Sequence, residues 1–138
     1  MKVMVFGTFD VLHKGHIFFL QQAKRMGKKL VVVVSRDETV NKLKGKKPIY
    51  NYKQRIGFIN KINIADKIIA GDLIDIFKCI REEKPDIIAL GYDQKYFIDK
   101  LNNYIKEKKL KIRILKLKPY YPKKYKSSII KKKIKKYE

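Results

Sequence analysis

Residues 7–17 read Gly7-Thr8-Phe9-Asp10-Val11-Leu12-His13-Lys14-Gly15-His16-Ile17 and contain both histidines of the chain. The apolar run Val3–Phe6 precedes them and predicts a buried strand. Apolar residues then recur at helical spacing, at positions 17, 20, 23 and 26, which predicts a helix over Gly15–Met26. A turn from a parallel strand into a helix is a place where free backbone N–H groups bind phosphate. The two histidines therefore predict a site that binds an anion and takes part in a reaction of that anion.

Strand-like and helical segments alternate along the rest of the chain. Further strands are predicted at Leu30–Ser35, Lys67–Ala70, Asp86–Leu90 and Lys111–Leu115. Further helices are predicted at Tyr52–Ile62, Leu73–Glu83 (with Asp72 as its cap) and Tyr96–Lys108, whereas Arg36–Asn51 reads as a loop with a single helical turn. Right-handed crossovers between such strands produce a parallel sheet. We therefore expect an α/β, Rossmann-like five-stranded parallel sheet of order 3-2-1-4-5 with helices on both faces.

The length of 138 residues predicts a single domain over residues 1–138, with a basic C-terminal segment over residues 118–138. No apolar run approaches the length of a membrane span, and the first strand begins without an apolar leader segment before it. One cysteine, Cys79, excludes an internal disulfide, and its place on an apolar helical stripe predicts a buried thiol. These features predict a cytoplasmic protein without membrane contact.

The charge is strongly positive, with 35 Lys and Arg residues against 13 Asp and Glu residues and a net charge of +22. Residues 106–138 alone hold 15 of the basic residues. Such a field attracts nucleotides, phosphates and nucleic acids alike. Lysine predominates, and it is a solvated point charge of low geometric specificity. The charge therefore leaves three interpretations open: a solvated surface, steering of an anionic substrate, or incidental binding of nucleic acid.

Two further segments place polar residues where a ligand could bind. The sequence Gly91-Tyr92-Asp93-Gln94 directly follows the fourth predicted strand, at the point where the strand order reverses beside the histidines. Asp93 could accept hydrogen bonds from a sugar or position a magnesium ion, although aspartate also suits ordinary turns. Ser127 and Ser128 are good helix N-caps, and the N–H groups beyond them would form a second anion site.

The pattern Gly-Thr-Phe-Asp-x-Leu-His-x-Gly-His in residues 7–16 resembles the hallmark turn of the cytidylyltransferase-like nucleotidyltransferases. The resemblance covers nearly the whole chain. It implies that His13 and His16 contact a nucleoside triphosphate and stabilise charge on its α-phosphate. It also implies that Gly15 lets the backbone approach the phosphates and that Asp10 holds the turn. The remaining nucleotide-binding residues that it implies in this turn are Gly7, Thr8 and Phe9.

The resemblance also assigns roles to basic residues outside the turn. Lys46, beside Lys47, corresponds to a loop lysine that folds over the phosphates, and Arg55 corresponds to a phosphate contact in the following helix. The family carries an Arg-Tyr-Val-Asp segment where this chain reads Asn63-Ile64-Ala65-Asp66, so one phosphate-binding arginine is missing. The candidate replacements are Lys61 and Lys67.

Two more family features lie near the C-terminal half of the chain. Ser127 and Ser128 match the signature at the start of the last helix, and Ser128 is the candidate catalytic residue there. The turn lining the nucleotide and acceptor pockets corresponds to Gly91, Tyr92, Asp93 and Gln94.

Among these nucleotidyltransferases, the chain is most similar to the archaeal FAD synthases in the segments Arg36–Val40, Lys42–Pro48 and Leu90–Gln94. That resemblance implies transfer of AMP from ATP to the phosphate of FMN, with Mg²⁺ bridging the triphosphate oxygens and a homodimer as the assembly. Tyr120, Tyr121 and Tyr125 are candidates to pack on the flavin ring. Three alternatives stay open: a glycerol-3-phosphate cytidylyltransferase, a sugar-phosphate adenylyltransferase, and a nucleic-acid-binding module on the same fold.

Overall fold

The computed structural model describes residues 1–91 and 94–118, and within them a five-stranded parallel sheet has the order β3-β2-β1-β4-β5. This confirms the predicted fold class and strand order. The strands are β1 (Lys2–Gly7), β2 (Lys29–Val34), β3 (Lys67–Ala70), β4 (Ile87–Leu90) and β5 (Arg113–Lys116). β1 lies at the centre, and its neighbours β2 and β4 run parallel to it. The strand order reverses between β1 and β4, which is where open α/β sheets bind their ligands.

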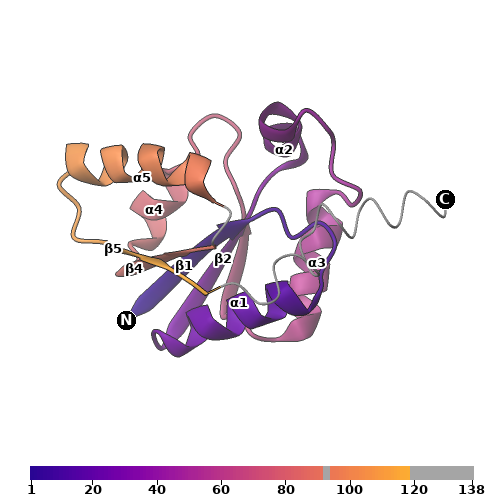
Figure 1. The fold of residues 1–138 in the computed structure, drawn as a ribbon, viewed down its shortest axis with the longest axis horizontal. Coiled ribbons are helices and arrows are strands. Elements are labelled where there is room, and N and C mark those ends of the chain that lie inside the picture. Colours follow the sequence, from indigo (N-terminus) through magenta and orange to yellow (C-terminus); the bar gives the residue numbers. More distant parts are fainter. Residues whose placement is uncertain (92–93, 119–138) are drawn as a thin grey trace.

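Helices cover both faces of this sheet (Figure 1). The described helices are α1 (Lys14–Arg25), α2 (Asp37–Lys44), α3 (Tyr52–Ile62), α4 (Lys78–Glu83) and α5 (Lys95–Glu107). α1 and α3 pack on one face, whereas α4 and α5 pack on the other (Figure 1). The alternation of side chains along β1 explains the two cores, because Val3 and Val5 enter one cluster and Met4 enters the other.

Two predicted elements were wrong. The segment predicted as a loop with a single helical turn contains the eight-residue helix α2, which ends at Gly45 in the left-handed conformation (φ 69°). Only Val40 of this helix is buried, so the sequence showed no apolar stripe there. The helix predicted from Leu73 begins instead at Lys78, because the Asp72 carboxylate caps a turn by accepting from the N–H groups of Ile74 (2.9 Å) and Asp75 (2.8 Å).

The remaining elements begin and end within two residues of their predicted bounds. Cys79 lies in the core between α4 and the sheet, and burial raises the pKa of its thiol to about 12. This confirms a buried thiol at that position. None of the helices that the structure describes is long and apolar enough to cross a bilayer.

Candidate active site

The histidine turn, residues 7–16, leaves the carboxyl end of β1 and enters α1 (Figure 1). His13 is the N-cap of α1 and has extended backbone angles (φ −144°, ψ 178°). Its Nδ1 accepts a hydrogen bond from the N–H of Gly15 at 3.0 Å. Nδ1 of His16 accepts in turn from the N–H of His13 at 3.3 Å. The histidines therefore form a reciprocal capping box, in the positions where Ser or Thr and Glu usually stand.

This capping arrangement determines which ring nitrogen of each histidine carries the proton. A neutral imidazole carries one proton, and a ring nitrogen that accepts a hydrogen bond cannot hold it. Since Nδ1 accepts in both histidines, both neutral rings carry their proton on Nε2. The ring centroids lie 4.0 Å apart, so the two rings form a paired unit. Each ring thus acts as an N–H donor through Nε2 rather than as a base, and the Nε2 atom of His13 is buried within the turn.

The backbone N–H groups at the start of α1 depart from the predicted phosphate cradle. The N–H of Gly15 bonds to the His13 side chain, and those of His16 (3.0 Å) and Ile17 (3.2 Å) bond to the His13 carbonyl oxygen. These three N–H groups therefore already donate hydrogen bonds to acceptors of His13. Favourable interaction with an anion would come from the imidazole N–H donors and from the helix dipole.

Burial lowers the pKa of His13 below its ordinary value of 6.5. The ring is therefore neutral at pH 7, which is the state that the Nδ1 bond from Gly15 requires. A protonated ring would donate from both nitrogens and could not accept this hydrogen bond. Protonation of His13 would therefore remove the cap of α1.

We expect the free energy of unfolding to decrease as the pH falls below 6.5. The pKa of His13 is lower in the folded chain than in the unfolded chain, so the unfolded chain takes up the proton first. The contribution of neutral His13 is complete above pH 6.5 and is lost as the pH falls through the lowered folded value. Urea unfolding between about pH 7.5 and pH 5 measures this decrease. The variant His13→Asn keeps a capping oxygen without a titrating ring; an equal decrease in that variant would contradict the assignment.

Phe9 links the start of the turn to its second histidine. Its backbone has a positive φ of 51°, yet its side chain is buried in the core. The ring packs edge-on against His16, with centroids 5.6 Å apart. A Cβ atom placed on Gly7 would lie 2.5 Å from the Phe9 ring, so glycine is required there by close approach. Gly7 and Phe9 therefore set the position of the His16 ring from inside the molecule.

Asp10 connects the histidine turn to the segment that follows α2. Its carboxylate is buried and accepts from the N–H groups of Ile49 (2.7 Å) and Tyr50 (2.8 Å). Just before these residues lies the lysine loop, residues 45–48, in which Lys46 and Lys47 are exposed. The tertiary structure thus brings the segment that directly follows both predicted lysines into contact with the histidine turn, through hydrogen bonds that span some 40 positions of sequence.

Arg55 is a correction to the sequence-based interpretation. Its side chain is completely buried, and its guanidinium bonds to the carbonyl oxygens of Tyr50 and Thr8 and to the carboxylate of Asp37. In this structure Arg55 faces protein groups, not the solvent from which a phosphate would come.

Gln94 also bonds to the protein itself. Its amide Nε2 donates to the carbonyl oxygen of Phe6 at the end of β1 (2.8 Å). Its Oε1 accepts from the N–H of Gly91 at the end of β4 (2.8 Å). The side chain therefore bridges the two strands at the point where the sheet order reverses.

Several predicted residues are not placed at the site. Lys67 is the first residue of β3, so it lies at the amino ends of the strands, whereas the histidine turn lies at their carboxyl ends; its side chain pairs with Glu83 at 2.7 Å. Asn63, which ends α3, precedes β3 and lies near the same amino ends. The missing arginine is therefore not replaced by Lys67. The predicted residues that lie outside the described part of the chain are Tyr92, Asp93, Tyr120, Tyr121, Tyr125, Ser127 and Ser128.

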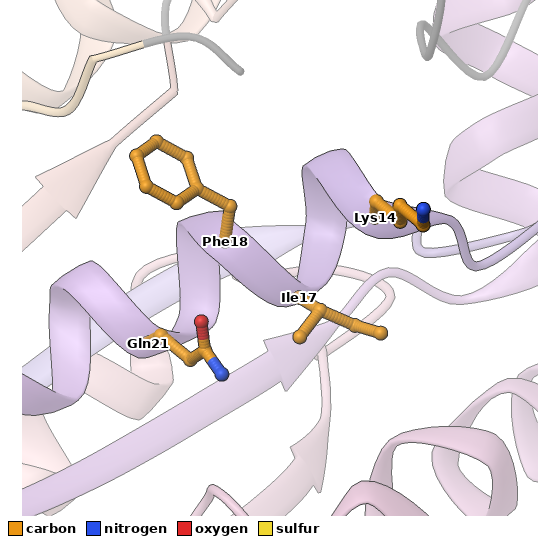
Figure 2. Close-up of a pocket in the computed structure, with 4 residues that line it drawn as sticks. All are labelled: Lys14, Ile17, Phe18 and Gln21. Atoms are coloured by element: carbon orange, nitrogen blue, oxygen red, sulfur yellow. The ribbon is translucent and has the colours of Figure 1, made fainter. Parts of the chain in front are cut away.

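The outer face of α1 carries a pocket that the sequence did not predict. Figure 2 shows Lys14, Ile17, Phe18 and Gln21 around this open hollow, whose volume is about 260 Å³. Ile17 shares its helical spacing with Leu20 and Ala23, but only the latter two are buried residues of α1. Residues 14, 17, 18 and 21 are spaced so that they lie on one face of a helix, and this spacing is the sequence signal that could have indicated the pocket.

Comparisons with known proteins agree with this geometry. The cytidylyltransferase-like family model matches residues 4–133. An FAD synthase of Thermoplasma volcanium is 40% identical over 134 residues, which are 97% of this chain and 94% of that protein. An FAD synthase of Archaeoglobus profundus is 43% identical over 118 residues, 86% of this chain and 75% of the relative.

A solved structure, described as a lipopolysaccharide core biosynthesis protein of Thermoplasma volcanium, superposes with a TM-score of 0.80. It is 40% identical in sequence, and the match covers 87% of this chain and 98% of that one. Because the family model spans almost the whole chain and the two relatives match 86% and 97% of it, the protein belongs to the cytidylyltransferase-like family, alongside the archaeal FAD synthases.

Proposed function

We propose that this protein is an FMN adenylyltransferase, which transfers AMP from ATP to the phosphate of FMN and yields FAD and pyrophosphate. Relatives named FAD synthase are 37–43% identical to it over most of its length. The observation that carries the chemistry is the pair of imidazoles at the start of α1, both with Nδ1 occupied and the proton on Nε2. Two neutral donors at a helix N-terminus suit a phosphate that gains negative charge during the reaction.

In the proposed reaction, an oxygen of the FMN phosphate attacks the α-phosphorus of ATP in line. A new O–P bond forms while the bond between the α-phosphorus and the bridging oxygen breaks, and pyrophosphate leaves with the electron pair. His13 and His16 donate hydrogen bonds to the oxygens around the α-phosphorus. Lys46 and Lys47 add positive charge from the lysine loop. Catalysis then depends on positioning and charge stabilisation, with no covalent intermediate on the protein.

Magnesium is part of this proposal and would arrive with the substrate. Among residues 1–91 and 94–118, no group of three or more His, Cys, Asp or Glu side chains gathers as a metal site. The carboxylate nearest the histidines in sequence, Asp10, is buried and accepts from two backbone N–H groups. These residues fit a Mg²⁺ ion that is held mainly by phosphate oxygens and water, as is usual for this cation. When bound, the ion would neutralise charge on the triphosphate.

The test of the acceptor is a matrix of nucleotides and acceptors. We expect pyrophosphate release with Mg²⁺, ATP and FMN, and FAD as the chromatographed product. Replacing ATP by CTP, or FMN by glycerol 3-phosphate or a sugar 1-phosphate, should lower the rate by at least about 100-fold. Turnover with CTP and glycerol 3-phosphate would support nucleotidyl transfer as the reaction class but contradict FMN as the acceptor. Absence of turnover with every pair would favour the nucleic-acid-binding alternative.

Other parts of the sequence-based interpretation stay predictions. They are the roles of Tyr92, Asp93, Ser127 and Ser128, the homodimer, the cytoplasmic location and incidental binding of nucleic acid. The net charge of +22 supports electrostatic attraction of ATP and FMN, both of which are anions.

A further inference from the structure

Arg55 is a buried cation whose hydrogen bonds join three separate segments of the chain. Nε donates to the carbonyl oxygen of Tyr50 (2.9 Å), and Nη1 donates to that of Thr8 (2.8 Å). Nη2 donates to Oδ1 of Asp37 at 2.6 Å, at the first residue of α2. A guanidinium presents its donors in a rigid planar fork, so these three acceptors are held in a fixed relation to one another.

The peptide segment at residues 49–50 is held from both sides. The N–H groups of Ile49 and Tyr50 donate to Asp10, and the carbonyl oxygen of Tyr50 accepts from Arg55. Both anchors lead back to the histidine turn, because Asp10 lies in it and Arg55 also binds the Thr8 carbonyl oxygen. The two segments are therefore fastened to each other at adjacent points.

These hydrogen bonds, which fasten residues 49–50 to the histidine turn, position groups that the proposed reaction needs. The Thr8 carbonyl group begins the peptide that leads into Phe9, whose ring packs against His16. On the other segment, Lys47 precedes Ile49 by two residues, so its Cα lies within about 7 Å of the anchored position. The fastening thus determines both how the His16 ring is supported and from where the lysines extend.

We propose that Arg55, paired with Asp37, is a positioning residue that fastens the lysine loop to the histidine turn and so aligns Lys46 and Lys47 with the imidazoles. This proposal rests on the proposed function. Asp37 balances the charge of a side chain that has no access to water, whereas Asp37 itself is 30% exposed. Replacing Asp37 by asparagine keeps its size and a carbonyl oxygen while it removes the balancing charge. The variant Asp37→Asn therefore loosens the fastening without emptying the site.

The kinetic test is a double-mutant cycle between Asp37→Asn and the pair Lys46→Ala/Lys47→Ala. We expect Asp37→Asn to lower kcat about ten-fold in the native chain. In the background without the two lysines, the same substitution should lower kcat by less than about two-fold, because there is no lysine left to align. Arg55→Lys, which keeps the charge and loses the fork, should behave like Asp37→Asn. If Asp37 had a purely structural role, Asp37→Asn would lower kcat by the same factor with and without the two lysines. That outcome would overturn the proposal.

A second measurement needs no substrate. In Asp37→Asn the amide hydrogens of Ile49 and Tyr50 should exchange with solvent at least about ten-fold faster, while those of β1 and β2 keep their rates. The matched control is Asp75→Asn, which breaks the surface ion pair between Asp75 and Arg81; it should change neither kcat nor these exchange rates.

Unchanged exchange at residues 49 and 50 in Asp37→Asn would overturn the proposal whatever the kinetics. If the native protein fails to turn over ATP and FMN, the proposed function fails, and the exchange rates still decide whether the fastening exists.

Discussion

Replacing His13 by asparagine should lower kcat by at least about 100-fold and leave the free energy of unfolding at pH 7 almost unchanged. Asparagine is among the best N-cap residues, so its side-chain oxygen can accept from the N–H of Gly15 as Nδ1 does now. Its amide NH₂ group lies closer to the backbone than Nε2–H of the imidazole, so the proposed donor to the α-phosphate is lost. Urea unfolding and steady-state FAD formation measure the two quantities on the same preparation.

The capping box provides matched controls for this experiment. His13→Ala removes both the cap and the donor, so it should lose activity and also about 1 kcal/mol of stability. His16→Gln keeps a side-chain acceptor for the N–H of His13 and should, like His13→Asn, lose activity alone. If His13→Asn retained full activity, His13 would be only a helix cap, and the proposed mechanism would be wrong.

The variant Gly7→Ala should destabilise the fold by about 1–3 kcal/mol and lower kcat at least about ten-fold. The added methyl group would overlap the Phe9 ring, at 2.5 and 2.6 Å from two of its carbon atoms. The ring is buried and packs against His16, so it cannot move away without displacing the imidazole. Thermal unfolding and FAD formation measure the two effects.

Gly57 offers the matched control for Gly7. It lies within α3, and a Cβ atom built on it has no neighbour within 4 Å. Gly57→Ala should therefore stabilise the protein by about 0.5–1 kcal/mol through helix propensity and leave kcat unchanged. If Gly7→Ala and Gly57→Ala had the same effect, close packing of Phe9 under the turn would not be what positions His16.

The sequence by itself determined the architecture and predicted the place of the candidate site. Its alternation of apolar runs with amphipathic segments predicts parallel strands joined by helices, and the handedness of such crossovers leaves few possible strand orders. The run from Gly7 to His16 identified the strand-to-helix turn and its two histidines, because a local motif needs no tertiary information. Cys79 was identified as a core residue on the same kind of evidence, its position on a helical stripe.

Tertiary structure alone decided which polar residues can face a ligand. Arg55 and Gln94 are predicted binding residues, but in the structure Arg55 is buried and both side chains bond to backbone carbonyl groups of distant segments. No local pattern could show this, because Arg55 bonds to a carbonyl group 47 residues away and Gln94 to one 88 residues away. The existence of α2 was hidden for a related reason, since a helix that buries only Val40 has no apolar period. Local periodicity reports burial along one element, whereas the partner of a polar group depends on how distant segments pack.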